Sequence, residues 1–106
     1  MKYALLIYSS ENGRPDPEII AEYMAISDEP TTVGGAQLQP GATATTVRVE
    51  NGSTLTTDGP FSETKEVLGG FFLVEADDID AALDVAARIP AARLGGAVEV
   101  RPLVER

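Results

Sequence analysis

The segment VLGGFFLVEA (Val67–Ala76) is apolar at both odd and even positions. A strand that is covered on one face alternates apolar and polar residues, whereas a strand covered on both faces is apolar throughout. YALLIY (Tyr3–Tyr8) has the same character. Both segments therefore predict strands that are covered on both faces. The paired glycines Gly69 and Gly70 predict a bulge or a close approach of another backbone.

Two helices are expected between these strands and after them. Asp16 precedes Pro17 and predicts the first helix, with the proline at its first position, and this helix must end before Pro30. Asp77 is the predicted cap of a second helix, which Pro90 ends.

The clearest local signal is a β-hairpin. TTVRVE (Thr45–Glu50) alternates, Asn51-Gly52 follows, and STLTT (Ser53–Thr57) alternates again. A type I′ turn needs positive φ at both of its central residues, and Asn and Gly tolerate positive φ better than other residues do. We also expect a short strand at Ala36–Leu38 and a last strand at Ala97–Val104.

This order of elements predicts one α+β domain over residues 1–106, a ferredoxin-like α/β sandwich with an extra β-hairpin. Two helices cover one face of a four-stranded sheet, yet two strands are apolar on both faces. The same face of a second copy would cover the other side. We therefore expect a homodimer whose stacked sheets form a dimeric α/β barrel.

Composition excludes much of the chemistry that enzymes use. The 106 residues contain no His and no Cys, so disulfides, thiol nucleophiles, Ser-His-Asp triads and His- or Cys-based metal sites are excluded. The net charge of −9 argues against nucleic acid and membrane surfaces as partners. We expect no cofactor. We also expect no metal, because Asp77, Asp78 and Asp80 lack the remaining ligand spacing of a Ca²⁺ site, and helix capping and the helix dipole account for them.

The first residues of the chain bear on where in the cell the protein is found. Lys2–Tyr8 is a short apolar run that is typical of a strand rather than of a signal peptide, and no stretch approaches the length of a membrane span. A cytoplasmic location is therefore the expectation.

The loop DGPFSETKE (Asp58–Glu66) contains many side chains that could bind a ligand or catalyse a reaction. It holds three carboxylates, one of the two lysines, two hydroxyls and a phenylalanine. The plain structural interpretation is a turn, in which the Asp58 side chain bonds backbone amides and Gly59 supplies positive φ. The functional interpretation makes Asp58 a general acid or base.

The string DGPFSETKEVLGGFFLVEADDIDAAL resembles the DGPF family, named for the motif DGPFAETKE, within the YCII-related superfamily. The stretches MKYALLIY, ATATTVRVENG and GGAVEVRP resemble it too. The resemblance implies a dimeric ferredoxin-like barrel. It also implies lyase-like or isomerase-like chemistry on small organic molecules by an Asp–His pair at the dimer interface, or association with extracytoplasmic-function sigma factors.

Asp58, Pro60 and Phe61 match the family's Asp-Pro-Phe element, so the resemblance makes Asp58 the candidate catalytic residue. The partner His has no counterpart in this chain. A lone carboxylate acts as a base at neutral pH only if desolvation or a neighbouring carboxylate, such as Glu63 or Glu66, raises its pKa.

The remaining candidates would bind a small organic ligand. Each also has a plain interpretation: packing for the aromatic residues, a rigid turn for Pro60, and solvation for the charged ones. The candidate ligand-binding residues are Tyr8, Arg48, Pro60, Phe61, Lys65 and Glu66. Three functions stay open: a ligand-binding or weakly catalytic dimer, a regulatory partner of a sigma factor, and a stable dimer whose loop is only architectural.

Overall fold

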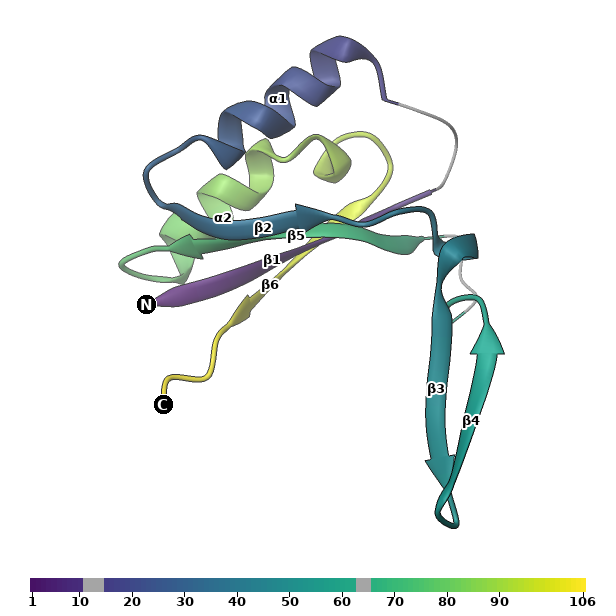
Figure 1. Ribbon diagram of the computed structural model, residues 1–106. Helices are drawn as coiled ribbons and strands as arrows, with labels where there is room; N and C mark the ends of the chain where they lie inside the picture. The colour runs from purple at the N-terminus through teal and green to yellow at the C-terminus, as the bar shows by residue number, and fades with distance from the viewer. Residues whose placement is uncertain (11–14, 63–65) are drawn as a thin grey trace.

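The computed structural model describes residues 1–10, 15–62 and 66–106 (Figure 1). Within these residues it contains two α-helices, a four-stranded antiparallel sheet and a separate two-stranded hairpin. The elements are β1 (Lys2–Ser9), α1 (Pro17–Ser27), β2 (Thr32–Gln37), the 3₁₀ turn η1 (Gly41–Thr43), β3 (Thr45–Glu50), β4 (Ser53–Asp58), β5 (Val67–Glu75), α2 (Ile79–Arg88), the 3₁₀ turn η2 (Pro90–Ala92) and β6 (Ala97–Pro102).

The strand order of the large sheet is β2-β5-β1-β6. The two segments that are apolar at every position, β1 and β5, are thus the central strands, as their sequences indicate. Leu5 lies opposite Phe72 on one side and Val100 on the other, so three apolar side chains form a row across the sheet.

The glycine pair in β5 produces both features that its sequence predicts. Ile7 pairs with Gly70 and Tyr8 pairs with Leu68, which leaves Gly69 as the extra residue of a bulge. A Cβ atom at Gly70 would lie 2.8 Å from the carbonyl oxygen of Ala36, so the neighbouring backbone leaves no room for a side chain there.

Both helices lie on one face of the sheet, and the core forms between them and that face (Figure 1). Tyr3, Leu5 and Val74 are at most 2% exposed in this core. The opposite side, here called the open face, is covered by no described element. Its paired positions carry Lys2, Ala4, Leu6, Tyr8, Gly34, Ala36, Leu68, Phe71, Leu73, Glu75, Ala97, Glu99 and Arg101. The sheets of a single chain are open and do not close into a barrel.

Helix starts differ partly from expectation. The cap of α2 is Asp78 and not Asp77, and the Asp78 carboxylate accepts the N–H of Ala81 at 2.9 Å. Asp77 lies one residue too early because Asp78 is still extended and the helix begins at Ile79. Asp16 does occupy the cap position of α1, but its side chain makes no capping hydrogen bond.

The boundaries of two strands differ from the predicted ones. The short strand expected at Ala36–Leu38 is instead β2, at Thr32–Gln37. Pairing with β5 holds this glycine-containing segment extended, although its own residues only weakly favour a strand. The last strand ends at Pro102 rather than at Val104.

The predicted hairpin is confirmed. Asn51 and Gly52 have φ values of 49° and 78°, so both central turn residues adopt the positive φ that a type I′ turn requires. The hairpin β3–β4 projects away from the sheet on the side opposite the helices (Figure 1). In the described part of the chain, neither helix has the length and apolar character needed to cross a membrane.

Candidate functional site

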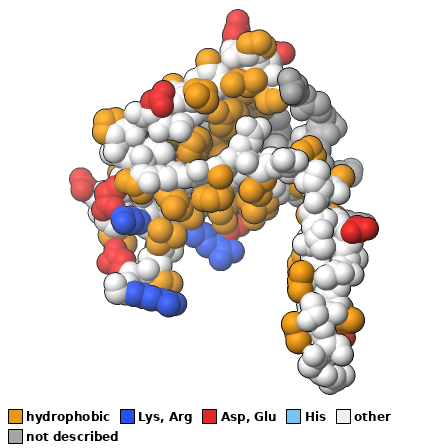
Figure 2. Space-filling model, viewed as in Figure 1, with side chains coloured by type: hydrophobic (Ala, Val, Ile, Leu, Met, Phe, Trp, Pro, Cys, Tyr) orange, Lys and Arg blue, Asp and Glu red, His pale blue; other side chains and the backbone are white. Residues whose placement is uncertain are grey.

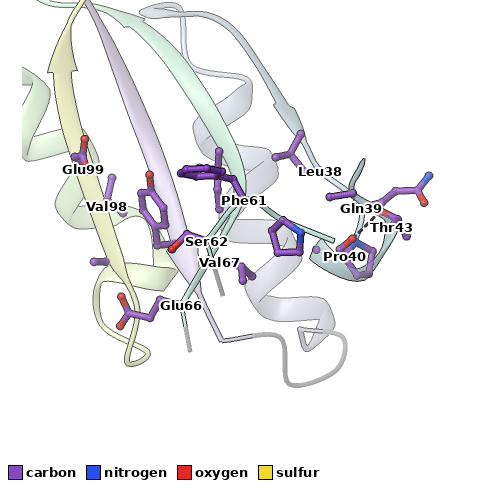
Figure 3. Close-up of a pocket in the computed structure, with 16 residues that line it drawn as sticks. Leu38, Gln39, Pro40, Thr43, Phe61, Ser62, Glu66, Val67, Val98 and Glu99 are labelled. Atoms are coloured by element: carbon purple, nitrogen blue, oxygen red, sulfur yellow. Dashed lines mark hydrogen bonds between the residues drawn. The ribbon is translucent and has the colours of Figure 1, made fainter. Parts of the chain in front are cut away.

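A hollow of about 1430 Å³ lies between one end of the sheet and the base of the hairpin. The ends of β1, β5 and β6 form one wall, and the segments that enter and leave the hairpin form the other (Figure 3). It is lined by Tyr8, Leu38, Gln39, Pro40, Gly41, Thr43, Ala44, Pro60, Phe61, Ser62, Glu66, Val67, Leu68, Ala97, Val98 and Glu99.

Four of the six predicted ligand-binding residues line this hollow: Tyr8, Pro60, Phe61 and Glu66. Tyr8 reaches it because it lies near the end of β1 on the open face, opposite Leu68 and Ala97. The structure therefore brings these four residues to one place, and their role in binding stays a prediction.

The turn at Gly59 directs the chain from the hairpin into the wall of the hollow. Gly59 has a φ of 98°, as its predicted role in a turn requires. Its N–H donates to the carbonyl of Ala44 at 2.8 Å, and its own carbonyl accepts the hydroxyl of Thr46, also at 2.8 Å. These bonds hold the start of Pro60–Ser62 against the base of β3.

Asp58, the candidate catalytic residue, is the last residue of β4. It pairs with Thr45 across the hairpin, is exposed, and is not among the residues that line the hollow. Its role as an acid or base stays a prediction.

Arg48 does not line the hollow either, but it contacts the wall through Phe61. Its guanidinium carbon lies 4.8 Å from the centroid of the Phe61 ring. The Phe61 side chain is 73% exposed, which leaves its ring accessible to a ligand. Lys65 and Glu63 lie outside the described residues.

Sequence reasoning missed the wall between β2 and β3 and the contribution of β6. Pro40-Gly41 marks a turn in the sequence, but nothing local shows that this turn faces Tyr8. Val98 and Glu99 reach the hollow only because β6 pairs with β1. Figure 3 shows Leu38, Phe61 and Val98 from these separate segments around one space.

The hollow is mainly apolar and has a small number of polar groups. The Thr43 hydroxyl donates to the carbonyl of Pro40 at 2.6 Å (Figure 3), and the Glu99 carboxylate pairs with Arg101. Tyr8, Ser62 and Glu66 add a phenol, a hydroxyl and a carboxylate. Sites for small organic molecules have this composition. Among the described side chains, no group of three acidic residues is placed to hold a metal ion.

The family model for the YCII-related domain matches residues 1–106, the whole chain. The protein belongs to the YCII-related domain family. It is also similar to an uncharacterised protein of Rhizobium meliloti (strain 1021), with 36% identity over 97% of this chain and 92% of the relative. The YCII-related domain thus includes both walls of the hollow and the hairpin between them.

Proposed function

We propose that this YCII-related protein is a homodimer that binds a small organic ligand in the hollow beside the Asp58–Phe61 loop. The observation that carries the proposal is the convergence of Tyr8, Phe61 and Glu66 on one mainly apolar space. Such a space with few polar groups is the default location of a ligand site. The exposed Phe61 ring offers a flat apolar surface to a planar or ring-containing ligand.

The dimer is supported by the open face. Leu6, Phe71 and Leu73 form its centre on the two middle strands, and no described element covers them. Stacking this face on its own copy would give the ferredoxin-like dimeric barrel that the sequence predicts.

Membership in the DGPF subfamily is part of the proposal, and the motif from Asp58 to Glu66 supports it. Asp58 would add acid–base catalysis to ligand binding only if the ligand extends from the hollow to the end of β4, where Asp58 lies. Association with a sigma factor remains the alternative, and the net charge of −9 suits a basic partner surface.

A thermal-shift screen of small organic molecules tests the binding site, because a ligand of the folded state raises the melting temperature by mass action. The screen compares wild type with Phe61→Ala and Met24→Ala. Met24 is 58% exposed on α1, so its truncation is a matched loss of an exposed apolar side chain far from the hollow.

A compound that stabilises wild type and Met24→Ala but not Phe61→Ala supports the proposal. Compounds that stabilise all three proteins equally place binding elsewhere, and a screen without any stabilising compound counts against a ligand site. Asp58→Asn then separates binding from catalysis. If wild type converts a compound found in the screen, and Asp58→Asn binds that compound without converting it, Asp58 takes part in the reaction.

A further inference from the structure

We propose that the β3–β4 hairpin is a dimer arm, whose apolar side chains pack against a second copy of this chain. The inference rests on the homodimer proposed above and names the element that holds it together.

Within the described chain, the hairpin meets the rest of the protein mainly at its base and through the contact of Arg48 with Phe61. Its two strands contact each other, and among the described residues they pack extensively against no other element. Every residue of β4 is exposed, and Val47 and Val49 of β3 are 59% and 67% exposed. An isolated two-stranded hairpin is marginal in water, so this one needs a surface to cover it.

The size of the chain shows how much surface is available to a partner. A compact chain of this mass exposes about 5700 Å², whereas this one exposes 7585 Å². The radius of gyration is 15.4 Å, against about 13 Å for a compact domain of this length. The excess of about 1900 Å² exceeds the roughly 800 Å² that each partner buries in a standard interface.

The direction and length of the hairpin suit a second copy on the open face. It projects on the same side as that face (Figure 1), and six-residue strands span about 20 Å. Stacked sheets lie about 10 Å apart, so the hairpin is long enough to reach past the partner's sheet layer. Figure 2 shows hydrophobic side chains along the edge of the hairpin that borders the space beneath the sheet.

The charge of this surface permits a second copy of the same chain to dock there. The chain carries a net charge of −9, so two copies repel wherever acidic residues dominate. The open face and the hairpin are nearly balanced, which lets two copies approach there. Together they carry the basic residues Lys2, Arg48 and Arg101 and the acidic residues Glu50, Asp58, Glu75 and Glu99.

The hollow is also wide in a single chain. Its volume of about 1430 Å³ exceeds the 300–1,000 Å³ that is usual for a small-molecule site. Because its lining includes Tyr8 and Glu99 of the open face, a partner on that face would narrow it. Each ligand site would then have walls from two chains.

The double variant Val47→Thr/Val49→Thr tests the arm. Threonine keeps the shape and strand propensity of valine but replaces an apolar methyl group with a hydroxyl. Met24→Gln is the control, because it removes an exposed apolar side chain from the helix layer. Sedimentation equilibrium measures the dimer dissociation constant, and circular dichroism checks that each variant folds.

We expect wild type and Met24→Gln to dimerise with the same constant, and the arm variant to dissociate at least tenfold more readily. An arm variant that dimerises like wild type would overturn the arm and leave the homodimer standing. A monomeric wild type would overturn both.

A second measurement keeps the test decisive if the variant folds poorly. In a wild-type dimer mixed from isotope-labelled and unlabelled chains, the Val47 and Val49 methyl groups should show NOE contacts to the other chain. A dimer that lacks these contacts refutes the arm.

Discussion

The guanidinium of Arg48 lies over the ring of Phe61, at 4.8 Å from its centroid. Arg48 belongs to β3, and Phe61 belongs to the loop that follows β4. This contact joins the hairpin to the wall of the hollow, so it couples the proposed arm to the proposed ligand site.

A tryptophan reporter measures this contact, because the chain contains no Trp. In a Phe61→Trp background, Arg48→Gln should increase quenching of the emission by acrylamide, since one face of this largely exposed ring loses the guanidinium that lies over it. The expected cost in stability is about 0.5–1 kcal/mol, as for exposed cation–π pairs. Arg106→Gln makes the same change in net charge and should leave quenching unaltered. If the Arg48→Gln change leaves quenching of the reporter as it was, the contact is refuted.

The ion pair between Arg88 and Glu29 should give a pH-dependent contribution to stability. Both guanidinium nitrogens donate to the carboxylate, at 2.8 and 2.9 Å, and this holds the pKa of Glu29 below its usual value. A carboxyl with a lowered folded-state pKa contributes stability above its unfolded-state pKa, near 4.3, and loses it as the pH falls through the folded-state value.

Glu29→Gln should therefore cost less than about 1 kcal/mol at pH 7, because the pair is largely exposed. The difference from wild type should shrink below about pH 4. Urea unfolding of both single variants and of Glu29→Gln/Arg88→Gln gives the coupling energy at each pH. Coupling that persists unchanged at pH 2 would contradict the assignment.

Gly96 should tolerate no side chain. A Cβ atom there would lie 2.2 Å from the carbonyl oxygen of Tyr8, so Gly96→Ala must displace backbone at the end of β1. We expect a loss of about 1–3 kcal/mol in the free energy of unfolding. Gly69→Ala is the matched control, because its Cβ would meet nothing closer than 3.8 Å. Equal unfolding midpoints in urea for the two variants would show that the backbone relaxes without cost.

The two helix caps offer a comparison within one chain. Asp78→Ala should cost about 1 kcal/mol, because it removes the bond that the Asp78 carboxylate accepts from Ala81. Asp16→Ala should cost clearly less, because the Asp16 side chain makes no such bond. Thermal unfolding of both variants checks the order, and a reversed order would contradict these cap geometries.

Much of the fold was predictable because its signals are local. The Asn51-Gly52 turn, the glycine bulge and the apolar character of β1 and β5 depend on backbone preferences and on periodicity within short segments. Errors came where local signals compete or are weak. Asp77 and Asp78 are both good caps, and β2 becomes a strand through its pairing with β5.

Part of the candidate site was predictable from the resemblance of the loop at Asp58–Glu66. That signal singled out Pro60 and Phe61, and the charged composition of the loop added Glu66. Neither signal distinguished the hollow from the exposed end of β4, where Asp58 lies. Both also missed Val98 and Leu38, because a sheet brings together residues that are far apart in the chain.

Residue types and short-range patterns thus determine the elements of this protein, its acidic charge and the absence of histidine and cysteine chemistry. Only the tertiary structure decides that Tyr8, Phe61 and Glu99 surround one space and that the hairpin projects beside an uncovered sheet face. The reason is physical: turns and periodicity act over a few residues, whereas strand pairing and the direction of a projecting hairpin depend on contacts between distant segments.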